Sequence, residues 1–203
     1  MQFRHLFLIG IIGFLFSCTK ELPQQIPQAK IYFIFGNVQV NGQTAKINQI
    51  LTENDKLSTG PESSVEMILD PQTGVQLREN SEADVKFKDA GWQLDVKHGA
   101  VLNLVARGTR YNLKSPSAVI AVRGTIYYTH VYNDTSQYIC NCNGTIEIDY
   151  GNEIKTVSSS HHTPYSVEGH GSGIKIQSDV MKEHDDVQIF EFMYRFDEAV
   201  RDK

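Results

Sequence analysis

The sequence predicts an all-β domain followed by one C-terminal helix, and two patterns support this prediction. From residue 31 onward, short runs of β-branched and aromatic residues alternate with polar residues and are separated by Gly, Asn and Pro, which is typical of strands and turns. From residue 184 to 200 the apolar residues recur instead at helical spacing, as Val187, Phe190 and Tyr194 do. Strands at regular spacing with no helix between them indicate an all-β fold.

The strands expected in the first half of the domain each end at turn residues. Asn41-Gly42 is a strong hairpin signal. Residues 71–74 form another turn, and His98-Gly99 is expected to end the last of these strands. The expected ranges are 31–35, 38–40, 65–69, 75–77, 85–88 and 92–97.

The strands expected in the second half follow the same rule, with turns at 122–125 and at Asn143-Gly144. Asp185 and Asp186 then open the predicted helix, where carboxylates cap and favour a helix N-terminus. The expected strand ranges are 101–106, 110–113, 118–122, 126–132, 137–142, 145–150, 154–157 and 166–167.

The first residues predict a targeting signal. Arg4 precedes an apolar run over 6–16, which is too short to span a bilayer and has the length of a signal-peptide core. The run ends in Leu15-Phe16-Ser17-Cys18, which resembles the lipobox of bacterial lipoproteins, whose cysteine receives the lipid. We expect a signal peptide over 1–17, with Cys18 as the lipidated residue and a tether over 18–29. A simple signal peptide with a chance Cys18 is the alternative.

The charge balance and the residue pattern exclude several classes of function. The chain has a formal net charge of −5, which argues against nucleic acid or an anionic membrane surface as its partner. Contact with a membrane is therefore expected through the lipid anchor alone. No arrangement of Ser, His and Asp and no carboxylate pair in a cleft motif stands out for catalysis, so a non-enzyme is predicted.

The stretch from Leu113 to Tyr127 contains Val122-Arg123-Gly124-Thr125, and it resembles the signature of the FecR-like domain. The resemblance covers roughly 31–131 and implies an envelope domain of rolled or solenoid-like β form. In the regulators that name the family, this domain lies on the periplasmic side of a membrane-spanning sensor that passes a ferric-siderophore signal to a sigma factor. We expect no counterpart here of the cytoplasmic helical segment and the membrane helix ahead of that domain, and therefore no direct control of a sigma factor.

Three residues of that signature have expected structural roles. Gly124 allows a backbone geometry that other residues resist, and Thr125 begins the next strand. Arg123 offers five donors in a fixed fork, which suits the carbonyl groups of a turn between two strands. A grip on an anionic ligand is the alternative role for Arg123.

Cys140 and Cys142 are the other cysteines of the chain. On a strand, residues i and i+2 face the same side with parallel Cβ vectors, so a disulfide between them would require a distorted strand. The spacing suits two thiolates that point at one zinc or iron ion, with imidazole as the usual co-ligand. Candidate co-ligands are His161 or His162, which point to opposite faces if the segment is extended, and His184.

Asp186 follows His184 by two residues and is expected to orient its imidazole. This succession of Cys and His also resembles a C-terminal extension of some FecR-like proteins. A closed four-ligand site would pin the helix to the sheet. Two alternatives stay open: a metal- or thiol-dependent redox enzyme with an open coordination position, and a metal-free structural or interaction module.

The sequence thus predicts a FecR-like domain over 30–135 and a Cys/His-containing β extension with the helix over 136–203. We expect an envelope lipoprotein with a metal site and an envelope protein as partner. Thr19 after Cys18 agrees with the periplasmic face of the outer membrane, by resemblance to lipoprotein sorting patterns.

Overall fold

The structure is a computed structural model that describes residues 28–88, 91–151 and 153–201, and only the backbone of Arg123. The expected signal peptide, the expected lipidation site Cys18 and most of the tether lie outside these residues. Within them, no helix is long and apolar enough to cross a membrane.

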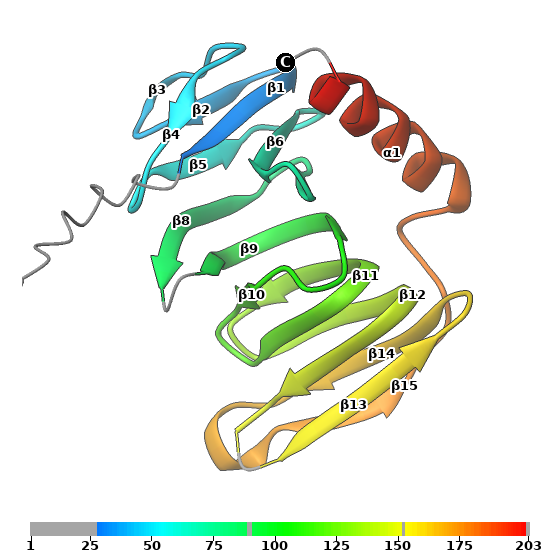
Figure 1. Cartoon of the computed structure of the whole chain (residues 1–203). Coiled ribbons are helices and arrows are strands. Elements are labelled where there is room, and N and C mark those ends of the chain that lie inside the picture. Colours follow the sequence, from blue (N-terminus) through cyan, green and yellow to red (C-terminus); the bar gives the residue numbers. More distant parts are fainter. Residues whose placement is uncertain (1–27, 89–90, 152, 202–203) are drawn as a thin grey trace, which may run out of the picture.

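The predicted all-β class with one C-terminal helix is confirmed (Figure 1). The described strands form one sheet of 15 strands, and α1 (Asp186–Arg201) follows them, after a short 3-10 turn at Gly171–Gly173. The strands are β1 (Ala29–Phe35), β2 (Val38–Val40), β3 (Gln43–Thr44), β4 (Ile50–Leu51), β5 (Lys56–Thr59), β6 (Ser64–Asp70), β7 (Thr73–Leu77), β8 (Glu82–Lys88), β9 (Gly91–Val105), β10 (Tyr111–Lys114), β11 (Val119–Asn133), β12 (Ser136–Asp149), β13 (Ile154–Ser159), β14 (Thr163–Glu168) and β15 (Lys175–Ser178).

The sheet folds back on itself because three long strands serve two layers. The first half of β9 pairs with β8 and β10, and its second half pairs with β7 and β11. In the same way, β11 and β12 pair with different neighbours along their two halves. One layer therefore contains β1, β4, β6, β7, β14 and β15, and the other contains β2, β3, β5, β8, β10 and β13.

Each long strand bends at a glycine with positive φ: Gly99 (95°), Gly124 (84°) and Gly144 (99°). A Cβ on Gly144 would lie 2.4 Å from the carbonyl oxygen of Gly124, so the two bends pack backbone against backbone. The expected strand breaks at 98–99, 122–125 and 143–144 are therefore wrong: they are bends within continuous strands. The sequence pattern also missed β3, β4, β5 and β15, and it assigned Thr73 and Gly74 to a turn although they begin β7.

The division at residue 135 falls in the short connection between β11 and β12, and the sheet runs across it because these strands pair along most of their length. The division into 30–135 and 136–203 stays a prediction.

Two apolar clusters follow from this arrangement. The larger one fills the space between the layers and includes Ile31, Leu57, Val85 and Tyr127. The second lies on the outer face of the first layer, beneath α1. In it, Ile189 and Phe192 of the helix pack against a patch made by β9, β11 and β12.

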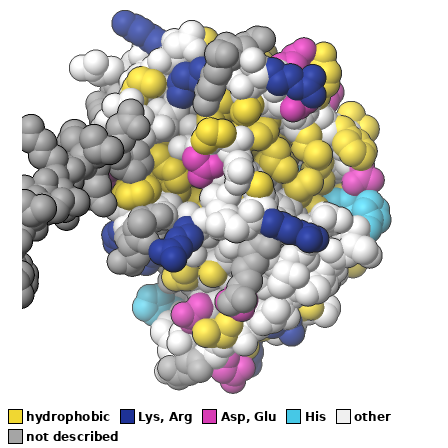
Figure 2. Space-filling model, viewed as in Figure 1, with side chains coloured by type: hydrophobic (Ala, Val, Ile, Leu, Met, Phe, Trp, Pro, Cys, Tyr) yellow, Lys and Arg dark blue, Asp and Glu magenta, His cyan; other side chains and the backbone are white. Residues whose placement is uncertain are grey.

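Helix α1 is fixed at both ends by its sequence. Asp185 caps it by accepting the Gln188 N–H at 2.9 Å. Farther along, the Phe196 ring occupies the space over Gly74, where a Cβ would lie 2.5 Å from that ring. Figure 2 shows hydrophobic side chains along α1 and over the sheet beside it. The helix therefore covers the outer face of one layer and stands close to the cysteines of β12.

Candidate metal centre

Cys140 and Cys142 lie on the outer face of the first layer, beneath α1. Strand alternation puts Tyr138, Cys140 and Cys142 in the cluster under the helix, whereas Ile139 points into the core between the layers. Both cysteines are buried, and their thiols are free. The two sulfur atoms thus face the same side, as the spacing predicts.

His162 reaches the thiols from the turn between β13 and β14. Because β14 pairs with β12, this turn lies beside the cysteines, and the His162 N–H donates to the Cys142 carbonyl at 3.2 Å. His162 has φ of 42°, so the turn is not extended there, and its Nδ1 stands 3.6 Å from the Cys140 Sγ. His161 does not reach the thiols: its side chain is 68% exposed and lies 3.9 Å from Asp186.

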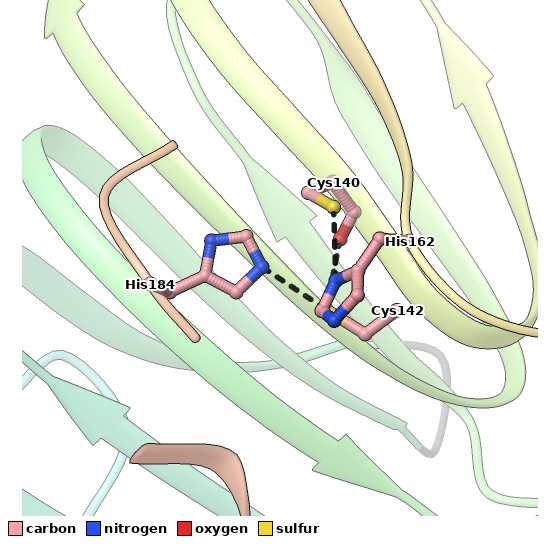
Figure 3. Close-up of side chains that lie close together, drawn as sticks. All are labelled: Cys140, Cys142, His162 and His184. Carbon is pink, nitrogen blue, oxygen red and sulfur yellow. Dashed lines mark hydrogen bonds between the residues drawn. The ribbon is translucent and has the colours of Figure 1, made fainter. Parts of the chain in front are cut away.

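His184 reaches the thiols from the segment that leads into α1. It is buried, and its Nε2 lies 3.4 Å from the Cys142 Sγ. Its ring stacks on Tyr128, with 4.5 Å between the ring centroids. Figure 3 shows the four side chains, which come from β12, from the turn before β14 and from the segment before the helix.

Two distances between ligand atoms match the edges of a tetrahedral zinc site. The four ligand atoms all lie within 4.8 Å of one another. With Zn–S bonds of about 2.3 Å and Zn–N bonds of about 2.0–2.1 Å, a tetrahedron has S···N edges of about 3.6 Å. The Cys140–His162 and Cys142–His184 distances are 3.6 and 3.4 Å. The residues present therefore fit one ion of this size.

Hydrogen bonds determine which nitrogen of each imidazole faces a thiol. The Nε2 of His162 lies 2.9 Å from Asp186 Oδ1, and the Nδ1 of His184 lies 2.9 Å from the carbonyl oxygen of Lys182. An ionised carboxylate and a carbonyl can only accept, so in a neutral imidazole the nitrogen that faces them carries the proton, and the other nitrogen has its lone pair toward the thiols. Asp186 was expected to orient His184, and this is wrong: it orients His162, whereas His184 is oriented by backbone.

The electrostatics of the cluster favour one thiolate. A hydrogen bond from Cys142 lowers the pKa of Cys140 to about 4, and contacts with His184 and His162 add to this against the effect of burial. The pKa of Cys142 is raised, because its proton is held by Cys140 and because burial opposes a second charge. Burial alone would lower the pKa of His162, but Asp186 and Cys140 together raise it. Thiolates are the form of cysteine that binds metals.

A second polar group, which the sequence did not reveal, fixes the segment that carries His184. The Glu183 carboxylate accepts the Tyr132 hydroxyl at 2.6 Å and lies 2.7 Å from His130 Nδ1. Glu183 also has a positive φ of 68°. His130 lies on β11. Its partner lies 53 residues away in an irregular segment, and no local pattern points to it.

The expected signature residues lie elsewhere, at the bend of β11. There, the Thr125 hydroxyl contacts Asn141 Oδ1 at 2.7 Å and the Asn143 carbonyl. Thr125 does not begin a strand, because β11 is continuous through it. The side chain of Arg123 lies outside the part of the chain that the structure describes.

Residues 55–147 match the family model described as FecR protein. The chain carries a FecR domain. Cys140 and Cys142 lie inside the matched range, whereas His162 and His184 follow it. The FecR domain thus supplies the thiols of the cluster, and the segment after it supplies the imidazoles.

Solved structures share the fold of this FecR domain. Two crystal structures of a candidate anti-sigma factor from Parabacteroides distasonis, at 1.65 and 2.50 Å resolution, match with TM-scores of 0.51 and 0.50. Both are 14% identical to the chain and cover 68% of it, and the chain spans less than two thirds of them, 64% and 63%. The likeness shows the fold. A search of curated proteins found no match.

Proposed function

We propose that this protein is a non-enzymatic signalling or interaction module of the cell envelope, anchored by lipid on Cys18. In this proposal, a zinc ion bound by Cys140, Cys142, His162 and His184 fastens the C-terminal segment to the FecR domain. The observation that supports the metal site most strongly is the orientation of the two imidazoles, each held by a hydrogen bond with its free nitrogen toward a thiol.

The ligand set favours zinc over iron. Two thiolates and two neutral imidazoles in a tetrahedral arrangement are a common closed site for zinc. Two thiolates would also neutralise the double positive charge of the ion. The free-energy cost of burying a single unpaired thiolate would then disappear. With four protein ligands no coordination position is left for a substrate, so the proposed role of the metal is structural.

Such an ion would join three parts of the chain that are far apart in sequence. They are β12, the turn before β14 and the segment that enters α1. Helix α1 lies after the residues that match the FecR model. Within the described residues, its backbone forms no hydrogen bonds with the strands of the sheet ladder, and side-chain contacts attach it to the sheet. Zinc at the N-terminal end of the helix would therefore strengthen the attachment of the helix to the sheet.

Metal content tests this part of the proposal. The full chain, purified without chelator or oxygen, is expected to contain about one equivalent of zinc. Cys142→Ser, His184→Ala and His162→Ala should each lose it, whereas His161→Ala should keep it. The two neighbouring histidines form a matched pair, because only His162 faces a thiol. Zinc below about a tenth of an equivalent, or equal loss in both histidine variants, would refute the site.

Envelope anchoring has its own test. It rests on the apolar run that ends at Cys18 and on the FecR match, because the resemblance to FecR-like regulators implies an envelope domain. Cells that express the chain should incorporate labelled palmitate into it, and Cys18→Ala should abolish the label. A wild-type chain without label would remove the lipid anchor from the proposal and leave the metal site unaffected.

The lowered pKa of Cys140 favours a second candidate, a thiol-dependent redox enzyme. Access argues against it, because Cys140 has no exposed surface and lies beneath the helix. Rapid reaction of the metal-loaded protein with a bulky disulfide reagent would favour the enzyme over the structural site.

A further inference from the structure

The outer face of α1 presents an apolar stripe that no described part of the chain covers. Val187, Phe190 and Tyr194 are 64%, 65% and 66% exposed. They recur at i, i+3 and i+7, the spacing that aligns side chains along one face of a helix. The opposite face of the helix carries Ile189, Phe192 and Phe196, which are buried against the sheet. Attachment to the sheet therefore does not account for the outer stripe.

Carboxylates border this stripe on both sides. At about 100° per residue, Glu191 and Glu198 fall on one side of it, and Asp186 and Asp197 fall on the other. The side chains of Glu191, Asp186 and Asp197 are 62%, 51% and 57% exposed. By the same rule Arg201 falls in line with the stripe at its C-terminal end, where it pairs with Asp197 of one edge. The face is thus apolar along its middle and negative along both edges.

A pocket of about 280 Å³ adjoins the Glu191 edge. Phe35, which is 61% exposed, lies on its rim, and the carboxylates of Glu62 and Glu79 line it. The two cations of the pocket are already engaged. Arg78 donates to the Glu183 carbonyl and to Gln188, both at 3.1 Å. Arg195 is bound to buried Glu66. The lining has three carboxylates, Glu62, Glu79 and Glu191, against these two cations, and this excess of negative charge suits the head of an incoming lysine or arginine.

We propose that this face of α1 docks a partner protein through an amphipathic helix whose apolar ridge is flanked by lysine or arginine. Helix pairs choose their partners through charges beside the apolar seam. A second copy of this chain would place Glu191 and Glu198 against equal charges, which opposes self-association. An anionic membrane surface would be repelled by the same edges. The proposal does not depend on the metal, because Phe192, Phe196 and Arg195 also hold the helix.

Peptide binding to the full chain tests the docking face. The probe is a fluorescein-labelled helical peptide of about 18 residues with leucines at i, i+3 and i+7 and lysines on both flanks. The control peptide has glutamates in place of the lysines. The lysine peptide should bind, and binding should weaken about tenfold or more in Phe190→Ala and in the double variant Glu191→Lys, Glu198→Lys. The double variant should instead bind the glutamate peptide.

Ile154→Ala is the matched control variant, because Ile154 is also an exposed apolar residue, at 66%, but lies on the distant β13. It should leave binding unchanged. Four outcomes would overturn the proposal. They are equal binding of both peptides, equal loss in Ile154→Ala, a dimer in sedimentation that Phe190→Ala dissociates, and binding to phosphatidylglycerol vesicles through Phe190 without peptide binding. The last two would assign the face to a second copy or to a membrane.

Discussion

A single carboxylate decides which nitrogen of His162 faces the thiols. Asp186 accepts from Nε2, and Nδ1 is left toward Cys140. The sequence predicted the residue types of the cluster, because the i, i+2 cysteines must share a face of their strand. It could not decide between His161 and His162, since that choice depends on the positive φ of His162. It also paired Asp186 with His184 instead of His162. Residues that are close in sequence at the start of a helix can point in different directions, so the spacing alone does not predict which side chains meet.

Asp186→Ala should weaken zinc binding without unfolding the protein. Loss of the hydrogen bond frees the His162 ring to turn, and such outer partners are worth about 10–100-fold in metal affinity. Competition with a chromophoric chelator measures the affinity. His161→Ala is the control and should change it little. An affinity in Asp186→Ala equal to that of wild type would show that backbone alone positions His162.

At the scale of elements, the three bends explain why the sequence pattern divided three continuous strands, β9, β11 and β12, into six. A glycine between two apolar runs is the usual mark of a turn, and Gly99, Gly124 and Gly144 each follow this pattern. Their backbone can instead bend a continuous strand so that its pairing passes from one layer to the other. The choice between turn and bend depends on neighbouring strands, which local sequence does not contain.

Gly144→Ala should destabilise the fold more than an ordinary substitution at positive φ. Both Gly144 and Gly42 have positive φ, but a Cβ on Gly144 would meet the Gly124 carbonyl at 2.4 Å, and one on Gly42 would meet nothing within 4 Å. Gly42→Ala should cost about 1–2 kcal/mol, the conformational penalty alone. Gly144→Ala should cost clearly more in urea unfolding. Equal costs would mean that the bend can relax.

Helix α1 is also held by an ion pair at its far end. Glu66 of β6 is fully buried, and it accepts from Arg195 at 2.6 Å and from Gln76 at 2.7 Å. No local sequence pattern predicts this pair, because its members are 129 residues apart. This ion pair and the buried side chains of Phe192 and Phe196 together attach the C-terminal half of the helix to the sheet.

Arg195→Met should destabilise the protein by about 3–5 kcal/mol in urea unfolding, because it leaves the Glu66 carboxylate buried without its cation. Adding Glu66→Gln should recover most of that loss, since a neutral amide can still bond to Gln76. A double variant as unstable as the single one would show that Arg195 acts through packing rather than through charge.

At the scale of the whole molecule, the period-2 pattern was sufficient to predict the all-β class, and the period-3.6 pattern to predict the closing helix. The arrangement of the strands in two layers could not be predicted from the sequence, because the prediction requires knowing which strands pair with each half of β9, β11 and β12. The core between the layers contains polar aromatic groups: Tyr111 and Tyr127 are fully buried, and the Tyr111 hydroxyl donates to Asn103 at 2.7 Å.

Alkaline pH should therefore unfold the protein. Burial raises the pKa of Tyr111 and of Tyr127 above the ordinary value of 10. Above that pH the unfolded chain loses these protons and the folded chain keeps them, so stability is complete below pH 10 and falls as the pH rises. Each tyrosine should remove about 1.4 kcal/mol by pH 11. Tyrosine absorbance and circular dichroism measure this, and ionisation of all tyrosines near pH 10 in a folded protein would contradict it.

The shared strands also limit which motions the proposed signalling role could use. Because β9, β11 and β12 belong to both layers, the layers cannot move apart like two lobes without losing their hydrogen bonds. Among the described elements, α1 is the long one that shares no ladder with the sheet. Its release would therefore break no hydrogen bond between strands. A relay built in this way would move one element, α1, which is packed on the sheet in one state and released from it in the other.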